Sequence, residues 1–378
     1  MEVYQGGVDP RHDPGMILVK KRGMFMLNDK QIQRMLRKLK RFEDTLDGMI
    51  FEKVCDLPVS AYETKESLYQ IPDSSLFEPI HPGDIWGGEG VYCWFKSSYT
   101  VPEELAGKPL FLRPSMGGYE AMLWVDGKPF GTFATKIVQT GHGNHYCDMF
   151  VKSPKAGQEV SLVVEFYAGH YIMGCMPYEE NPHHDFRFPF NSMDVCVKND
   201  KIANFYFNLR TLNELIEVLD DTSYRKAELI NTMMALHEVL YYDPANVSRE
   251  EFYAALEQGQ KIMAPALARH NSSAAPSVGV IGHSHMDTAW LWHIGETIKK
   301  CARTYSNQLN LMEQYPEYKF VQSSAYHSEV LRKHYPELFE RIRQKVLEGR
   351  YEPNGGVWVE CDCNITSGES MIRQFLWG

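Results

Sequence analysis

Two histidines and an aspartate stand at every second position directly after a short apolar run, and side chains of these types bind divalent cations. His283, His285 and Asp287 follow the run at 278–282 in the sequence VGVIGHSHMDTAWLW. Alternate side chains of an extended backbone point to the same side. The apolar run therefore predicts a buried strand whose carboxyl end gathers two imidazoles and a carboxylate, the first half of a metal site.

A second carboxylate follows another apolar run. Asp362 ends the sequence GGVWVECD at 355–362, which predicts a further strand of the same sheet. The carboxyl ends of parallel strands lie at one edge, so Asp362 is expected to meet His285 and Asp287. One imidazole and two carboxylates suit Zn²⁺, while Co²⁺, Mn²⁺ and Ca²⁺ also accept such ligands. Three protein ligands leave positions for water and substrate, or for a fourth ligand from elsewhere.

Simpler roles are expected for the neighbours of these residues. A histidine at a strand end usually caps a turn or binds a carbonyl, so His283 is not assigned to the site. Cys361 and Cys363 flank Asp362, and strand alternation turns both thiols to the opposite face, where they pack.

Another group of ligand-type residues lies further upstream and lacks the regular spacing of a metal motif. Its members are His170, His183, His184 and Asp185, near Cys175. A structural role is the favoured interpretation, and a contact with sugar or with the next domain stays open.

The elements that must position the site alternate between strand and helix from residue 278 onward. KFVQ at 319–322 predicts a second strand, one long helix is expected to end at Gly349, and residues 367–378 begin another helix. Such alternation is typical of a parallel β/α sheet or barrel. Three strands are too few to close a barrel or to cover a doubly wound sheet, so 278–378 is expected to be the start of a truncated, barrel-like β/α domain.

Upstream, short strands and turns predict an antiparallel β-sandwich over 51–210. Asp126-Gly127 and Asn199-Asp200 each stand between apolar runs and indicate hairpins. Residues 1–50 are read as an irregular arm followed by an amphipathic helix that begins after Asn28. Helical periodicity marks 211–270 as a connector, in which Ser248 is expected to cap a helix. The polar stretch at 271–277 marks a domain boundary.

Composition and charge disfavour a nucleic-acid-binding or membrane-spanning protein. The 378 residues are 44% hydrophobic and carry a formal net charge of -10, which disfavours nucleic acid as a partner. No apolar run has the length of a membrane span. The eight cysteines are irregularly spaced and the first residues lack the apolar core of a signal peptide, so a cytoplasmic location with free thiols is expected. The sequence does not select an oligomeric state, and a homo-oligomer is one possibility.

Several ordered blocks resemble glycoside hydrolase family 38, the α-mannosidases. HSHMDTAWLW at 283–292, the stretch at 322–360 and the closing DCNITSGESMIRQFLWG are similar to the start of the family's catalytic domain. WFKSSYTVPEELAGKPLFLR and WVDGKPFG resemble the amino-terminal region of the bacterial, cytosolic and vacuolar type. Such a series is more specific than a lone HxHxD.

The resemblance implies roles for four residues. His285, Asp287 and Asp362 correspond to metal ligands, Asp362 also to the catalytic nucleophile, and Trp290 to the floor under the mannose ring. Cys361 stands where the family commonly has a proline. The fourth ligand and the general acid come later in the family's domain and are not assigned here. The resemblance therefore implies a retaining, metal-dependent α-mannosidase acting on mannose-containing glycosides, present as an amino-terminal fragment with little activity alone.

Two other functions stay open at this point. A non-catalytic carbohydrate-binding protein would use the sandwich, and its sugar binding would survive Asp362→Asn and removal of metal. An unrelated HxHxD metallohydrolase would cleave amides or phosphate esters and ignore mannosides.

Overall fold

The computed structural model describes residues 28–118, 120–134, 146–169, 185–271, 273, 275–290 and 292–378. By their contacts the residues form two compact units. The helical unit comprises Met1–Asp47 with Asn204–Arg269, and the mixed unit comprises Gly48–Ala203 with His270–Gly378. None of the helices among the described residues is long and apolar enough to cross a bilayer.

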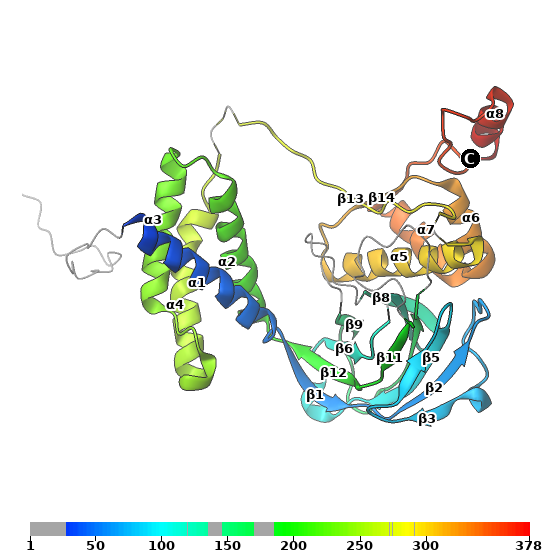
Figure 1. Cartoon of the computed structure of the whole chain (residues 1–378), viewed down its shortest axis with the longest axis horizontal. Coiled ribbons are helices and arrows are strands. Elements are labelled where there is room, and N and C mark those ends of the chain that lie inside the picture. Colours follow the sequence, from blue (N-terminus) through cyan, green and yellow to red (C-terminus); the bar gives the residue numbers. More distant parts are fainter. Residues whose placement is uncertain are drawn as a thin grey trace, which may run out of the picture. The chain divides into compact units, whose positions relative to one another are not determined.

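The helical unit is built around Phe42. Its helices are α1 (Asp29–Asp47), α2 (Asp200–Val218, which begins in the mixed unit), α3 (Tyr224–Val239) and α4 (Arg249–Leu267), with a 3-10 turn at Pro244–Asn246 (Figure 1). The ring of Phe42 contacts Phe205 of α2 and Phe252 of α4 edge-on. Both expected caps are present: Asn28 accepts from the Gln31 amide at 3.0 Å, and Ser248 forms a capping box with Glu251.

The hairpin expected at Asn199-Asp200 is wrong, because α2 begins at Asp200. The Asn199 side chain accepts a hydrogen bond from the Ile202 amide at 3.2 Å, and its carbonyl accepts from the Ala203 amide at 2.9 Å. Asn199 therefore starts a helix, a use of asparagine that competes with its use in turns. The helical region thus begins about ten residues before the expected position of 211.

The mixed unit contains the expected sandwich of two antiparallel sheets. One sheet has the order β1-β12-β6-β9 and the other β3-β2-β5-β10-β7-β8, and β4 pairs with β11 in a separate ribbon. The strands are β1 (Phe51–Asp56), β2 (Val59–Thr64), β3 (Glu78–Ile80), β4 (Ile85–Gly87), β5 (Tyr92–Thr100), β6 (Leu110–Ser115), β7 (Glu120–Val125), β8 (Lys128–Ala134), β9 (Asp148–Val151), β10 (Glu159–Tyr167), β11 (Arg187–Pro189) and β12 (Ser192–Lys198). Two 3-10 turns, Ser74–Leu76 and Glu103–Leu105, lie between strands. The hairpin expected at Asp126-Gly127 joins β7 to β8.

The six-stranded sheet is buried on both faces. Phe95, Leu123 and Val164 pack into the core between the two sheets. On the opposite face Trp94 and Trp124 pack against the helix α5 (Ile294–Gln314) and its neighbours. Figure 1 shows α5 lying across this sheet. The sandwich is therefore the layer on which the first helix of the β/α region rests.

Charged side chains are enclosed between α5 and the sheet. Lys299 of α5 and Glu165 of β10 form an ion pair in which both side chains are at most 1% exposed. The Lys299 ammonium group also donates to the Leu68 carbonyl. Arg303 pairs with Glu296 of the same helix and with Glu120 of β7. Burial raises the pKa of the Glu165 carboxyl even beside this lysine. The carboxylate therefore depends on the neighbouring ammonium group of Lys299 to stay charged.

A short parallel sheet follows, with the order β13-β14-β15. Its strands are β13 (Gly282–His283), β14 (Phe320–Gln322) and β15 (Tyr351–Pro353), and its helices are α5, α6 (Ala325–His334), α7 (Pro336–Leu347) and α8 (Gly368–Trp377). The alternation of strand and helix agrees with the sequence-based expectation for this region.

Three local predictions for this region are wrong. The run at 278–282 is not a buried strand: Val278 and Val280 are 79% and 92% exposed, and only Gly282 and His283 pair with β14. No layer among the described residues covers them. The third strand lies at Tyr351–Pro353 instead of 355–362. The single long helix is two helices, because Pro336 lacks the amide hydrogen that a helix interior requires and starts α7.

Candidate metal centre

Three side chains that could share one cation come together at the end of β13. His285, Asp287 and Glu360 each offer a ligand atom, and these atoms lie within 4.8 Å of one another. The His285 Nε2 atom is 3.2 Å from Asp287 Oδ1. The side chain of His285 is 69% exposed and that of Asp287 34%, so the group opens to solvent. His283, which was not assigned to the site, lies outside this group.

Alternation of side chains explains why His285 and Asp287 face outward together. Met286, between them, packs into the hydrophobic cluster beside α5, where the Thr304 hydroxyl contacts its sulfur at 3.9 Å. Thr288 also points inward, to the buried His327. Two inward anchors thus flank Asp287. The expectation that spacing by two residues joins His285 and Asp287 is met although this segment is not a strand.

Glu360 is brought to the group by the amino terminus of α6 and by α8. The carbonyl of Trp358 accepts from the Tyr326 amide and the Ser324 hydroxyl, both at 2.9 Å. The amide of Val359 donates to the Gln374 side chain at 2.8 Å. The segment that leads to Glu360 is therefore fixed at two successive residues.

Asp362, the expected third ligand, does not belong to this group in the structure. Its side chain is exposed and accepts from the Asn364 amide at 2.8 Å, as a carboxylate does at a turn. Sequence reasoning passed over Glu360, although a signal was present: residues 360 and 362 are two apart, so an extended backbone turns both carboxylates to the same side. Cys361 is half-buried and Cys363 exposed.

Trp290 stands on the loop between Asp287 and α5. Its ring is 65% exposed and meets Trp292 edge-on at 5.8 Å between centroids. The preceding residue, Ala289, has a φ of 55°, in the left-handed region that non-glycine residues rarely adopt. The Thr297 hydroxyl accepts hydrogen bonds from the Ala289 amide and from the Trp292 indole, at 2.9 and 3.1 Å. This buried threonine of α5 holds the loop in its unusual conformation.

The donor set fits a divalent cation. One imidazole and two carboxylates within this distance are donor types that Zn²⁺, Mn²⁺ and Co²⁺ accept. The open solvent side leaves coordination positions for water or for substrate hydroxyls, as catalytic metal sites do.

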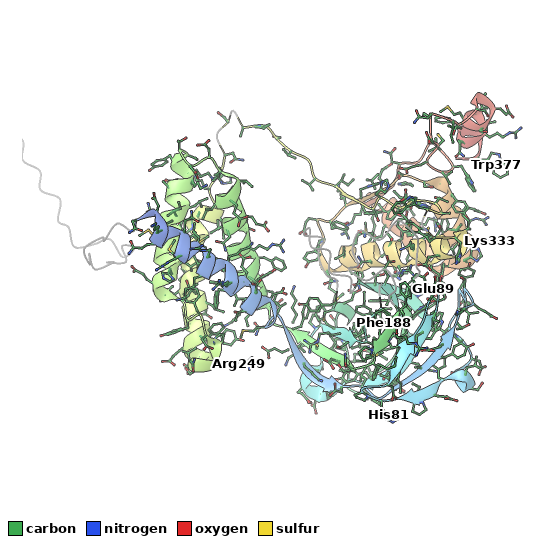
Figure 2. All side chains as sticks on the ribbon, viewed as in Figure 1. His81, Glu89, Phe188, Arg249, Lys333 and Trp377 are labelled. Atoms are coloured by element: carbon green, nitrogen blue, oxygen red, sulfur yellow. The ribbon has the colours of Figure 1, made fainter. Side chains whose placement is uncertain are left out.

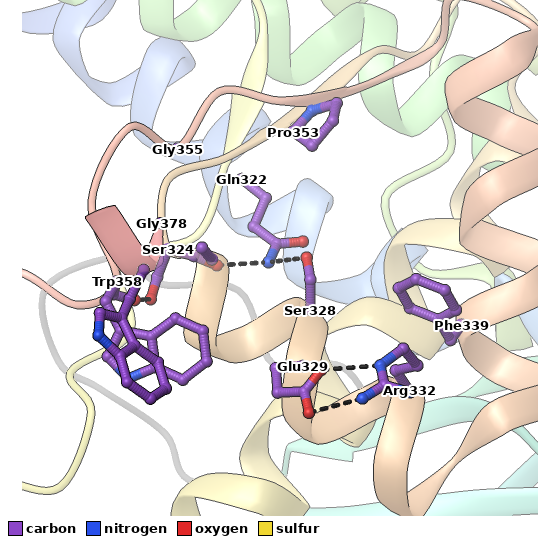
Figure 3. A pocket seen from close by; sticks show the side chains of 12 residues that line it. Gln322, Ser324, Ser328, Glu329, Arg332, Phe339, Pro353, Gly355, Trp358 and Gly378 are labelled. Carbon is purple, nitrogen blue, oxygen red and sulfur yellow. Dashed lines mark hydrogen bonds and ion pairs between the residues drawn. The ribbon is translucent and has the colours of Figure 1, made fainter. Parts of the chain in front are cut away.

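A cavity of about 330 Å³ lies close to the Glu360 segment but contains none of the three ligand-type residues. Figure 3 shows Trp358, Gln322 and the Glu329–Arg332 ion pair on its walls. The Trp358 ring also meets Trp377 of α8, labelled in Figure 2, with 5.9 Å between centroids. The cavity therefore borders the segment that carries Glu360.

Of the second group of ligand-type residues, only Asp185 lies among the described residues, and its carboxylate accepts from the Arg187 amide at 3.1 Å. His170, His183, His184 and Cys175 lie outside the described residues.

Comparison with protein families gives two matches. Residues 275–378 match the glycosyl hydrolases family 38 N-terminal domain. Residues 55–195 match the jelly roll domain of alpha-mannosidase. The first segment includes His285, Asp287 and Glu360, the three residues that could share a cation, and the second lies within the sandwich.

Curated relatives agree with these matches. Alpha-mannosidase G of Dictyostelium discoideum is 31% identical over 78% of this chain and 26% of its own length. Alpha-mannosidase 2C1 of Homo sapiens is 29% identical over 92% of this chain and 33% of its own length. The chain thus spans about a quarter to a third of these relatives. A β-glucuronidase of Faecalibacterium prausnitzii aligns with 39% of this chain and 32% of its own, at 12% identity and a TM-score of 0.27.

Proposed function

We propose, from the premise that this chain belongs to glycoside hydrolase family 38, that it forms part of an enzyme that hydrolyses α-mannosidic bonds. The resemblance expected from the sequence is confirmed by the two family matches and by α-mannosidase relatives near 30% identity. The observation that carries the proposal is the group of His285, Asp287 and Glu360 inside the segment that matches the family 38 domain.

We propose Zn²⁺ as the ion, held by His285, Asp287 and Asp362. The geometry of His285 and Asp287 supports two of these ligands. Asp362 follows Glu360 by two residues, about 7 Å along an extended backbone, and its turn with Asn364 must open before it can bind. Glu360 is the competing third ligand. Co²⁺, Mn²⁺ or Ca²⁺ are alternatives compatible with these donor types.

The proposed reaction is retaining hydrolysis. A carboxylate oxygen of Asp362 attacks the anomeric carbon while the bond to the leaving oxygen breaks, and water later releases the sugar from the aspartyl ester. A bound zinc ion supplies Lewis-acid polarisation and an anchor for two adjacent sugar hydroxyls. A general acid must protonate the leaving oxygen, and we assign none among the described residues.

Trp290 is proposed as the apolar floor under the sugar ring. Its exposed ring lies on the same loop as Asp287, and aromatic faces stack on the C–H face of sugars. An α-mannoside has an axial 2-hydroxyl next to its 3-hydroxyl, and this cis pair can reach one cation. The substrate class is therefore a terminal α-mannoside or a mannose-containing oligosaccharide.

Three further proposals concern the domain arrangement, the cellular location and the oligomeric state. The sheet β13-β14-β15 with its helices is proposed to be the opening of a barrel-like catalytic domain over 278–378, after a sandwich over 51–210 and a helical connector over 211–270. A cytoplasmic location is proposed because the seven cysteines among the described residues are free thiols, which reducing compartments maintain. A homo-oligomer is a further hypothesis.

Metal analysis tests the ligand assignment. Purified chain is expected to contain near-stoichiometric zinc by elemental mass spectrometry, and His285→Ala with Asp287→Ala is expected to lose it. The comparison of Asp362→Asn with Glu360→Gln decides the third ligand. Loss of zinc in Glu360→Gln alone would show that Asp362 is not a ligand in this chain.

Binding of epimeric inhibitors tests the substrate class. A mannose-configured iminosugar is expected to bind the zinc-loaded chain at least about tenfold more tightly than its glucose-configured epimer, since the two differ only at the 2-hydroxyl. Chelation of the metal should abolish this preference. Equal binding of both epimers would contradict the proposal.

The two alternatives predict other outcomes. Sugar binding that survives Asp362→Asn and metal removal would favour a carbohydrate-binding sandwich. The structure does not favour that function, since both faces of the six-stranded sheet are already covered. Metal-dependent hydrolysis of an anilide or an aryl phosphate, with no response to mannose-configured ligands, would favour an unrelated metallohydrolase.

A further inference from the structure

His327 of α6 is a buried histidine in contact with the loop that carries the candidate metal ligands. The residue is 3% exposed. Its Nε2 atom lies 3.0 Å from the Thr288 hydroxyl, and its Nδ1 atom lies 2.9 Å from the Tyr305 hydroxyl of α5. Both ring nitrogens thus have partners, one on the helix beneath and one on the residue next to Asp287.

The contacts fix the protonation state of this imidazole. Burial lowers its pKa to about 4, so His327 is neutral at pH 7. Tyr305 is 1% exposed. Among the described residues, its hydroxyl has a hydrogen-bond partner in Nδ1 of His327. A buried hydroxyl donates where an acceptor is available, so Tyr305 donates to Nδ1. The proton of the neutral ring then lies on Nε2, which donates to the Thr288 oxygen.

This hydrogen bond acts at the point where the loop leaves the metal group. Met286 and Thr288 are the inward anchors on either side of Asp287. Met286 packs in the hydrophobic cluster and accepts only a weak contact from the Thr304 hydroxyl to its sulfur. The next residue, Ala289, has the left-handed φ of 55° that the surroundings must maintain. A directional bond from a rigid buried ring to Thr288 restricts both the Asp287 side and the Trp290 side of the loop.

We propose that His327, acting through Thr288, is a positioning residue that sets the orientation of Asp287 for metal binding and of Trp290 beside it. The proposal rests on the proposed function, because it assigns the orientation to a metal site. The alternative is a purely structural role, in which His327 fills space in the hydrophobic cluster beside β14, as its neighbours on α6 do.

Variants separate the two roles. His327→Phe keeps the ring volume and removes both hydrogen bonds, while His327→Gln keeps a donor at about the position of Nε2. Val330→Ala is the matched control, because Val330 is 4% exposed on the same helix and has no polar group. Thr288→Val removes the same hydrogen bond from the loop side and replaces His327→Phe where that variant does not fold.

Hydrogen exchange of the metal-free chain is the first readout. The peptide spanning 284–292 contains the Ala289 amide, which donates to Thr297. It is expected to exchange faster in His327→Phe and Thr288→Val, and at the original rate in His327→Gln. Equal acceleration in Val330→Ala at the same loss of stability would overturn the proposal and leave His327 a space-filling residue.

Titration with Co²⁺, followed by its visible absorption, is the second readout. Loss of a group that orients a metal ligand typically weakens binding by 10- to 100-fold, so His327→Phe is expected to bind Co²⁺ about tenfold more weakly, with recovery in His327→Gln. Unchanged affinity with faster loop exchange would overturn the positioning role while leaving the metal site intact. A chain that binds no Co²⁺ at all would contradict the metal site of the proposed function, and hydrogen exchange would still decide whether His327 orders the loop.

Discussion

Replacing Lys299 by methionine tests whether the sandwich and the β/α region are held together by a buried charge pair. The change keeps a long, unbranched side chain but removes the only cation paired with Glu165 among the described residues. Glu165 is 1% exposed, so its carboxylate must either stay charged without a partner or take up a proton. Loss of one partner of a buried ion pair costs about 3–5 kcal/mol.

Protonation sets an upper limit to this cost and makes it depend on pH. With an ordinary glutamate pKa of about 4.3 and about 1.36 kcal/mol per unit, neutralising Glu165 costs at most about 3.7 kcal/mol at pH 7. The difference from the unchanged chain is smaller, because burial already raises the Glu165 pKa there. At pH 5 the same step costs about 1 kcal/mol. The Leu68 carbonyl also loses a donor, which adds about 1 kcal/mol at either pH. We therefore expect Lys299→Met to be markedly less destabilising at pH 5 than at pH 7, relative to the unchanged chain.

Tryptophan fluorescence in urea measures the free energy of unfolding of the mixed unit, which contains Lys299 and Glu165. All seven tryptophans lie in the mixed unit, so the signal reports the unfolding of that unit alone. Arg343→Met is the matched control, since its pair with Glu340 is half exposed and surface pairs contribute little to stability. The double variant Glu165→Met with Lys299→Met should recover most of the loss, because it leaves no unpaired charge. A loss equal to that of Arg343→Met, or equal at both pH values, would refute the reasoning.

Three further predictions concern local features. Ser248→Ala should destabilise the helical unit by about 1 kcal/mol, measured by far-ultraviolet circular dichroism in urea; no change would contradict the role of its capping box. His327 has a folded pKa of about 4, below the ordinary 6.5, so its contribution is complete above pH 6.5 and is lost as the pH falls. The unchanged chain should lose about 3 kcal/mol more than His327→Gln between pH 7 and pH 4 in fluorescence-monitored unfolding, and parallel curves would count against it. Ala289→Gly should stay within about 1 kcal/mol of the unchanged chain, because relief of the left-handed strain offsets the greater freedom of glycine in the unfolded state, whereas Ala289→Val should be clearly destabilised; equal stabilities of the two variants would argue against strain at this position.

Local chemistry was predictable where one interpretation of a residue dominates. Asp126-Gly127 forms the expected hairpin because glycine readily takes the left-handed conformation of the turn, and Ser248 caps its helix as expected. Asn199-Asp200 shows the limit of such signals. Asparagine serves turns and helix starts by the same hydrogen bond, in which a backbone amide donates to its side-chain oxygen. Only the helical continuation through α2 selects between the two.

Long-range burial was not predictable from a single segment. The apolar run SLVVEFY at 161–167 indicates a strand, but its central Glu165 is explained only by Lys299, which lies 134 residues away in the chain. The run at 278–282 has the same apolar character and is exposed. Apolar composition predicts that a segment can be buried, whereas a covering layer decides whether it is.

The candidate site was predictable in its residue types and only partly in its membership. Spacing by two residues predicts that His285 and Asp287 face the same side, and their side chains lie 3.2 Å apart in the structure. That both bind a metal stays a prediction. The choice between Glu360 and Asp362 depends on where the segment turns. Hydrogen bonds from Tyr326 and Ser324 to the Trp358 carbonyl, and from the Val359 amide to the Gln374 side chain, set that point. His327 gave no signal in the sequence, because a lone histidine on a helix has many uses.

The layer that α5 forms on the six-stranded sheet has a consequence for the order in which the chain is made. The last sandwich strand ends at Lys198, and α5 begins at Ile294. At a typical synthesis rate of about 5–20 residues per second, a ribosome needs about 5–20 s to add the intervening residues. During that interval a completed sandwich would present Trp94, Trp124 and the unpaired Glu165 to water. Chaperone binding or aggregation of this protein is therefore expected while the sandwich is complete and α5 is not yet made. The helical unit can fold during the same interval.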